Sequence, residues 1–321
     1  MIVSDRVYGK IEIKNKLILD LLRSSPVIRL KKIKQAGPTA LLIPSRVMTR
    51  FEHSVGVWYI LKKFGASLEE QVAGLLHDTP HTAFSHVADA LFPNKNHTFH
   101  EQFEEEIIKS SDIPEILKKH NMNLGKILNK GNFHLLEAEL PDLSADRIDY
   151  FLRDTRIDPI FPDSIVTLFL KDMSVRNSKF YFKTPATALL YANLFMEAGK
   201  FLWLDAASHG SHELLAQTLR RALETEIMTM HDLFKDDDEV LKLLQKSKDK
   251  VIQKHLAELT PKKKFDYAIK SEARFWGPNK PRLVDPFVDY NGKLVRISEI
   301  YTELKKIFAD FKATYSFVGV K

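Results

Sequence analysis

The chain has 321 residues, of which 44% are hydrophobic and 28% charged, which is typical of a globular protein. It contains no cysteine, which excludes disulfides, thiolate zinc sites, iron–sulfur clusters and cysteine nucleophiles. The formal net charge of +6 favours anionic partners without identifying them. No apolar run approaches the roughly 18 residues of a membrane span, and the first residues lack a signal-peptide pattern, so we expect a cytoplasmic protein with no membrane partner.

Helical periodicity dominates the chain, and glycine and proline mark its interruptions. In chain order it predicts helices over residues 16–25, 29–35, 52–64, 68–78, 85–91, 98–110, 144–155, 185–207, 211–233 and 298–311. Ser85 is the predicted N-cap of its helix, and Thr98 with Glu101 forms a predicted capping box. These patterns predict a mainly helical protein.

Extended structure is predicted at three places. A short segment follows Gly37-Pro38 at residues 40–44, and residues 179–183 alternate like a strand. Asn291-Gly292 lies between two alternating apolar runs, which is a strong signal for a β-hairpin. The fold class is therefore mainly α, with a helical body over residues 1–234 and a smaller α+β part over residues 235–321.

Metal chemistry without cysteine must use imidazole and carboxylate ligands. His53, His77, Asp78 and Asp146 are candidates, and a set of two His and two Asp suits one divalent ion, whether Fe, Mn, Ni, Co, Zn or Mg. His77 and Asp78 are adjacent at the end of a predicted helix, where both side chains can reach one ion. Each histidine taken alone also fits a hydrogen-bonded position in the core. A second doublet, His231-Asp232, has no companion residues and is interpreted as structural.

Three segments carry these candidates together with further histidines and arginines. They are Arg50-Phe-Glu-His53, Leu76-His77-Asp78-Thr-Pro-His81-Thr-Ala-Phe-Ser85-His86 and Ser144-Ala-Asp146-Arg-Ile-Asp-Tyr150-Phe-Leu-Arg-Asp154. The order His…His-Asp…Asp resembles the fingerprint of the HD-domain phosphohydrolase superfamily. The closer resemblance is to its branch of deoxynucleoside triphosphate triphosphohydrolases, which implies a helical-bundle fold and a nucleotide substrate.

The resemblance also implies a role for each matching position. The implied metal ligands are His53, His77, Asp78 and Asp146. The implied catalytic residues are His81 at the phosphate, His86 as general acid, and Asp89 with His100 as a pair that orients water. The implied substrate-binding residues are Gln35, Arg50, Arg147, Tyr150, Asp154 and His209. Ser144 and Ala36 depart from the pattern of the family, which leaves base preference and triphosphate preference open.

Three functional hypotheses follow. The first is a metal-dependent enzyme that releases deoxynucleoside and inorganic triphosphate from a deoxynucleoside triphosphate. The second is a phosphatase that acts on nucleoside monophosphates or another phosphoester with the same four ligands. The third is a non-catalytic module that binds a nucleotide or nucleic acid; nucleic acid is compatible with the charge but is not the expected partner. Related enzymes assemble, so a homo-oligomer is expected.

Overall fold

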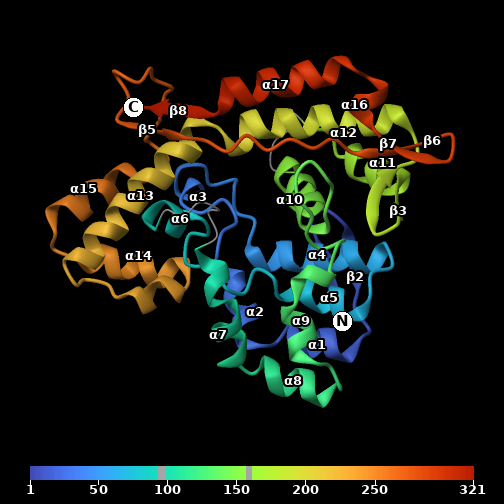
Figure 1. The fold of residues 1–321 in the computed structure, drawn as a ribbon. Coiled ribbons are helices and arrows are strands. Elements are labelled where there is room, and N and C mark those ends of the chain that lie inside the picture. Colours follow the sequence, from blue (N-terminus) through green and yellow to red (C-terminus); the bar gives the residue numbers. More distant parts are fainter. Residues whose placement is uncertain (93–98, 157–160) are drawn as a thin grey trace.

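The structure, a computed structural model, describes residues 1–92, 99–156 and 161–321 and is mainly helical (Figure 1). Its α-helices are α1 (Lys16–Leu21), α2 (Ser25–Arg29), α3 (Thr39–Leu42), α4 (Arg50–Lys63), α5 (Leu68–Leu76), α6 (Val87–Leu91), α7 (Glu104–Lys109), α8 (Ile113–Lys119), α9 (Leu124–Leu128), α10 (Ala145–Thr155), α11 (Ser164–Asp172), α12 (Pro185–Ala198), α13 (Ala206–Glu224), α14 (Asp237–Lys246), α15 (Lys250–Glu258), α16 (Ile297–Ile300) and α17 (Glu303–Tyr315). Short 3₁₀ turns and one π-turn are η1 (Leu30–Lys32), η2 (His100–Phe103), η3 (Lys130–Asn132), η4 (Gly199–Trp203) and η5 (Met230–Phe234). The predicted fold class, mainly α with a small α+β C-terminal part, is confirmed.

The strands form three small antiparallel or mixed sheets. They are β1 (Ile2–Asp5), β2 (Gly9–Glu12), β3 (Met173–Arg176), β4 (Lys179–Phe182), β5 (Phe275–Pro278), β6 (Phe287–Tyr290), β7 (Lys293–Arg296) and β8 (Phe317–Val320). The largest sheet has the order β3-β4-β6-β7, and β4 pairs with β6 in parallel. The predicted hairpin is present: Asn291 and Gly292 connect β6 to β7 with φ angles of 52° and 81°, as the two-residue turn requires.

Helix α4 lies at the centre of the molecule, against α5 and α10. Its start is fixed by a capping box, in which Thr49 Oγ1 accepts from Glu52 N while Glu52 Oε2 accepts from Thr49 N. Because the helix begins at Arg50, His53 falls in its first turns and faces α10. Most of α4 is buried, so its orientation is set by packing on both sides.

Two hydrophobic cores hold the elements together. The larger surrounds α1, α4, α5, α10 and α12 and extends to Val284 and Leu304. The second lies among α3, α6, α13, α14 and α15 and extends to β5 and β8. Both cores contain residues from before and after residue 234, and the division of the chain at that position stays a prediction.

Several predicted elements differ from the structure. Residues 39–42 form helix α3 rather than an extended segment: Ile43 N donates to Thr39 O at 2.8 Å, and buried Leu42 packs in the second core. A short apolar run is compatible with helix or strand, and tertiary packing decides between them. The break between the two long helices falls at Asp205, whose carboxylate accepts from Ser208 N and caps α13. Thr98, half of a predicted capping box, lies outside the described residues.

Among the helices that the structure describes, none combines the length and the apolar character that crossing a membrane requires.

Candidate functional site

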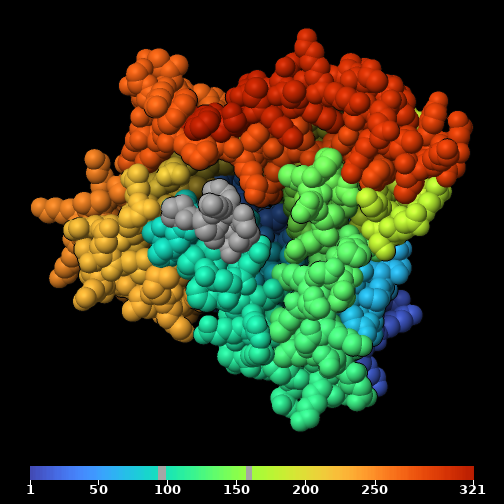
Figure 2. Space-filling view, in the orientation of Figure 1, coloured from blue at the N-terminus to red at the C-terminus, as the bar shows by residue number. Residues whose placement is uncertain are grey.

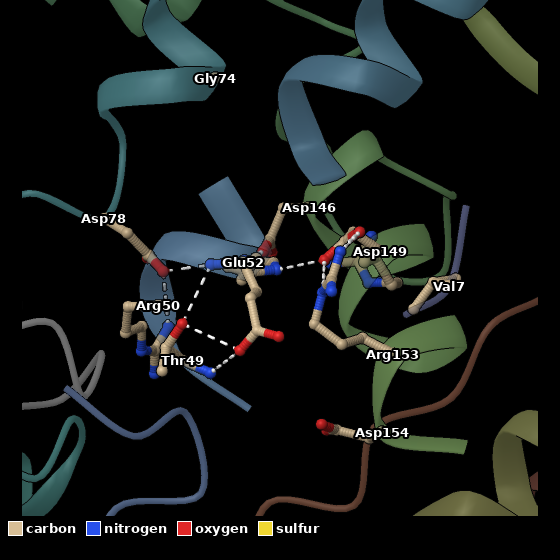
Figure 3. A network of polar contacts seen from close by, with 12 residues as sticks. Val7, Thr49, Arg50, Glu52, Gly74, Asp78, Asp146, Asp149, Arg153 and Asp154 are labelled. Atoms are coloured by element: carbon tan, nitrogen blue, oxygen red, sulfur yellow. Dashed lines mark hydrogen bonds and ion pairs between the residues drawn. The ribbon is translucent and has the colours of Figure 1, made fainter. Parts of the chain in front are cut away.

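The four predicted metal ligands meet between α4, the end of α5 and α10. His53 Nε2 lies 3.0 Å from Asp146 Oδ1, and His77 Nε2 lies 3.7 Å from the same oxygen. Asp78 completes the group, with Oδ1 3.3 Å from His77 Nε2 and Oδ2 3.8 Å from His53 Nε2. In Figure 3, Asp78 lies beside Arg50 and Asp149 lies beside Arg153, with Asp146 between the two pairs. The structure thus brings together side chains that are up to 93 positions apart in sequence.

Both histidines present their Nε2 atoms to the centre of this group. His77 Nδ1 donates to Gly74 O at 2.8 Å, and His53 Nδ1 donates to Asp149 Oδ2 at 2.7 Å. These acceptors hold a proton on each Nδ1, so Nε2 is the nitrogen of each ring that can bind an ion. The Nε2 atom of His77 is buried and has no hydrogen-bond partner among the described residues. An unpartnered buried nitrogen beside two carboxylates is the donor set that a divalent cation fits.

Asp149 was not among the predicted site residues, although it is fully buried behind His53. Its carboxylate also accepts from Arg153 Nε at 2.8 Å and from the Tyr8 hydroxyl at 2.6 Å. Arg153 in turn lies 3.1 Å from Asp5. The N-terminal β1–β2 hairpin is therefore connected through buried charges to a candidate metal ligand.

A glycine in α4 makes room for this network. A Cβ atom on Gly56 would lie 1.8 Å from Asp149 Oδ1, so no larger residue fits at this position while Asp149 keeps its place. Glycine costs about 1 kcal/mol in a helix interior relative to alanine. Gly56 in the middle of a predicted helix, three residues after His53, is the sequence signal that would have pointed to this close approach.

The loop after His77-Asp78 folds back over α4. Phe84 and Ser85 both have left-handed backbones, with φ of 58° and 57°, so Ser85 does not cap α6 as predicted. Instead its hydroxyl donates to Lys34 O at 2.6 Å and accepts from Arg50 Nε at 3.0 Å. The loop is also held by Asp237, whose Oδ1 accepts from Phe84 N. Such strain persists only where surrounding contacts determine the conformation.

Three further histidines gather next to the candidate ligands. His81 and His100 stack with ring centroids 3.7 Å apart, and His86 packs edge-on against His81 at 4.9 Å. His81 Nε2 lies 3.2 Å from Asp78 Oδ1. Burial lowers the pKa of all three, that of His100 to about 3. The cluster is therefore neutral at pH 7 and able to accept protons or hydrogen bonds from a substrate.

Asp89 pairs with His86 rather than with His100. Its Oδ2 lies 3.0 Å from His86 Nδ1, and its Oδ1 accepts from Phe99 N at 3.0 Å. Asp89 pairs with His86 because the two residues are only three positions apart at the start of α6. The expected Asp89–His100 hydrogen bond is not among the contacts of the described residues.

These groups line one cavity of about 950 Å³. That volume lies at the upper end of the roughly 300–1,000 Å³ of small-molecule sites. Figure 2 shows a hollow beside the green α10 segment, below the red C-terminal part. One wall carries Tyr150, 5.2 Å from Trp203 in an edge-on arrangement, while Trp203 Nε1 donates to Asp154 Oδ2 at 2.9 Å. Gln35 lines the same cavity with a buried Oε1 that lacks a partner among the described residues.

The predicted substrate-binding cations are already engaged. Arg50 Nη1 donates to Asp78 Oδ2 at 3.0 Å, and Arg147 donates to the backbone carbonyls of Ala138 and Asp142. His209 is not among the residues that line the cavity; His212, one turn further along α13, lines it instead. Burial lowers the pKa of both His209 and His212 to about 4. Lining residues from outside the predicted set include Arg46, Lys130, Glu137, Lys280 and Arg282.

Comparison with known proteins identifies the family. Residues 50–154 match the HD domain family. The chain is 35% identical to YdhJ, an uncharacterized protein of Bacillus subtilis, over 96% of this chain and 94% of that protein. It is 39% identical to the metal-dependent phosphohydrolase cns2 of Cordyceps militaris, over 48% of this chain and 45% of cns2. It is 35% identical over 106 residues to the deoxynucleoside triphosphate triphosphohydrolase SAMHD1 of Danio rerio, which is 28% of this chain and 17% of SAMHD1.

Solved structures share the fold along the whole chain. A phosphohydrolase of Bacteroides thetaiotaomicron superposes with a TM-score of 0.76 at 19% identity and covers 100% of this chain and 99% of that one. A hypothetical protein of Aquifex aeolicus superposes with a TM-score of 0.72 at 22% identity and covers 95% of this chain and 93% of that one. This chain belongs to the HD-domain superfamily of metal-dependent phosphohydrolases, as its motifs predicted.

Proposed function

We propose that the protein hydrolyses deoxynucleoside triphosphates to deoxynucleoside and inorganic triphosphate. The observation that carries this proposal is the meeting of His53, His77, Asp78 and Asp146 around a buried, unpartnered imidazole nitrogen, beside three more histidines in one cavity. The similarity of the HD segment to the fish triphosphohydrolase supports this substrate class.

The four ligands would hold one divalent ion. Such an ion supplies Lewis-acid stabilisation of the charge that develops on a phosphate during hydrolysis. Arg50 neutralises Asp78 on the side away from the candidate ion, with its Nη1 3.0 Å from Asp78 Oδ2. Although burial would raise the pKa of Asp78, Arg50 and the neighbouring histidines hold that pKa well below its usual range. Asp78 therefore stays ionised, as a ligand must.

His86 is the proposed general acid. Water forms a bond to the phosphorus and passes one proton to His100, the bond between phosphorus and the 5′ oxygen breaks, and protonated His86 donates its proton to that oxygen as deoxynucleoside leaves. The pKa of His86 is lowered by burial, which Asp89 partly offsets. The negative charge of a bound phosphate chain favours the protonated imidazole, so His86 is proposed to take up a proton when substrate binds and then to act as the acid. His81 and His100 are proposed to contact the phosphate and the water. Tyr150, Asp154 and Gln35 are proposed to contact the sugar.

A second candidate is hydrolysis of nucleoside monophosphates. It is favoured by the internal hydrogen bonds of Arg50 and Arg147, which leave fewer guanidinium N–H donors for a long phosphate chain. This reading predicts that monophosphates turn over faster than triphosphates. Homo-oligomer formation stays a prediction under either reading.

Product analysis tests the proposal. Purified protein with Mn²⁺ or Fe²⁺ is given a panel of deoxynucleoside triphosphates and monophosphates, and the products are separated by anion-exchange chromatography. We expect deoxynucleoside and inorganic triphosphate in equal amounts. Release of orthophosphate or pyrophosphate without triphosphate refutes the proposal. Asp146→Ala should be inactive, whereas His231→Ala should keep full activity, because His231 is exposed and Asp232 caps η5 and pairs with Lys235.

A further inference from the structure

The C-terminal part of the chain contributes a stretch of backbone to the cavity. Residues 277–282 leave β5 and lead toward β6, and Gly277, Pro278, Asn279, Lys280 and Arg282 all line the cavity. In Figure 1 this stretch belongs to the orange-red trace that crosses the molecule from β5 toward β6, past α10. It lies far outside residues 50–154, the part of the chain that matches the HD domain family.

Arg282 is the residue of this stretch that lies beside Tyr150 on α10. Its guanidinium carbon lies 5.6 Å from the centroid of the Tyr150 ring. Burial is the main cause that lowers the pKa of His86, and the charges of Arg50 and Arg282 lower it further. A guanidinium has five N–H donors, so one that bonds the Tyr150 side chain leaves others for an acceptor in the cavity.

The backbone on the far side of Arg282 is anchored. Leu283 and Val284 are buried, with 4% and 1% of their surface exposed. Asp285 N donates to Pro141 O at 3.0 Å, and the Asp285 carboxylate accepts from both the backbone and the hydroxyl of Ser298. Arg282 is therefore held at the cavity by the fold instead of projecting from a loop tip.

Several cations of the cavity have a carboxylate partner, whereas Arg282 has none within salt-bridge distance among the described residues. Arg50 pairs with Asp78, Arg46 with Asp205, and Lys130 with Glu104. Arg282 instead contacts Tyr150, with which it shares a side-chain hydrogen bond, and this contact supplies no carboxylate to balance its charge. A largely desolvated guanidinium with unused donors is a costly arrangement unless a ligand supplies the acceptors.

We infer that Arg282 binds a phosphate group of the nucleotide substrate, so that the C-terminal part completes the active site of the HD segment. The inference rests on the proposed nucleotide hydrolysis and names the residue that recognises the phosphate chain. A phosphate matches the planar fork of a guanidinium through two parallel N–H···O bonds. The same phosphate can then lie between Arg282, His86 and the candidate metal site.

Binding of inorganic phosphates tests the proposed contact between Arg282 and phosphate independently of turnover. Isothermal titration calorimetry compares inorganic triphosphate and orthophosphate on the full-length protein with its native metal content. Arg282→Gln should weaken triphosphate binding by roughly 10- to 100-fold, the loss expected for hydrogen bonds between charged groups. Arg282→Lys keeps the positive charge but lacks the planar guanidinium fork. Its affinity for triphosphate should therefore lie between that of the parent and that of Arg282→Gln. Lys293→Gln, which removes one exposed positive charge on β7, is the matched control and should bind like the parent.

The outcomes separate the inference from the proposed function. Equal triphosphate affinity in Arg282→Gln and the parent overturns the inference, and so does a parent protein that binds neither anion. If Arg282→Gln does not fold, as judged by its melting curve, Arg282→Lys serves as the test. Triphosphate binding by Arg282→Lys that equals that of the parent then contradicts the proposed two-hydrogen-bond contact between Arg282 and a phosphate. If triphosphate binding depends on Arg282 but no deoxynucleoside triphosphate is cleaved, the inference stands while the proposed function fails.

Discussion

His53 Nδ1 and Asp149 Oδ2 lie 2.7 Å apart, and both side chains are buried. The pairing sets the tautomer of His53, so its other nitrogen faces Asp146. Asp149 also carries the charge that balances Arg153. One carboxylate thus serves both the candidate metal site and the buried ion network behind it.

Asp149→Asn should therefore weaken metal retention. The amide places a donor or a weaker acceptor opposite His53 Nδ1, and partners of this kind contribute about 10- to 100-fold to metal affinity. The free energy of unfolding should also fall, by about 3 kcal/mol, because Arg153 loses part of its charge partner. Metal content after dialysis and urea unfolding measure the two effects. Tyr8→Phe, which removes one hydrogen bond to Asp149 and keeps its charge, should lose less metal; an equal loss in both variants contradicts this role of Asp149.

Gly56→Ala tests the close approach of α4 and α10. Alanine favours a helix over glycine by about 1 kcal/mol, yet its Cβ would fall 1.8 Å from Asp149 Oδ1 and 2.3 Å from Arg153 Nη2. We expect lower stability and lost metal retention, measured by thermal unfolding and elemental analysis. Gly131→Ala is the control, since its nearest neighbour would be 3.5 Å away. A Gly56→Ala protein that is as stable as the parent would show that Asp149 does not occupy this position.

Metal binding should release a proton near neutral pH. Burial alone would lower the pKa of His53, but its hydrogen bonds to Asp146 and Asp149 raise that pKa to about 10. In the metal-free protein the imidazole is therefore protonated at pH 7, and an ion must displace this proton from Nε2. We expect affinity for Mn²⁺ to rise about tenfold per pH unit between pH 6 and 8. Calorimetry of the chelator-treated protein in buffers of different ionisation enthalpy measures the proton; a buffer-independent enthalpy contradicts the prediction.

His209 and His212 should make the protein sensitive to acid. Burial lowers the pKa of each to about 4, whereas an unfolded histidine titrates near 6.5. Between these values the unfolded chain binds more protons than the folded one, so stability should fall as the pH drops from about 6.5 to 4. The double variant His209→Gln, His212→Gln should flatten this dependence in melting experiments. His231→Gln, at an exposed position, should leave the slope unchanged.

The sequence by itself determined the fold class, the family and the four candidate ligands. The reason is that these features are local: helical periodicity and the adjacent His77-Asp78 doublet do not depend on distant partners. The hairpin at Asn291-Gly292 was predictable for the same reason, since its turn demands two left-handed residues.

The tertiary structure alone decided which side chains meet. Asp149 was not predicted to belong to the site, and its role follows from the close packing of α10 against Gly56. Arg282 was not predicted either, and its proposed role depends on the segment after β5 that lines the cavity. Arg50 and Arg147 line the cavity as predicted, but their guanidinium groups hydrogen-bond to Asp78 and to backbone carbonyls of the protein itself. Hydrogen-bond partners and free charges depend on distances between segments far apart in the chain, and periodicity carries no information about those distances.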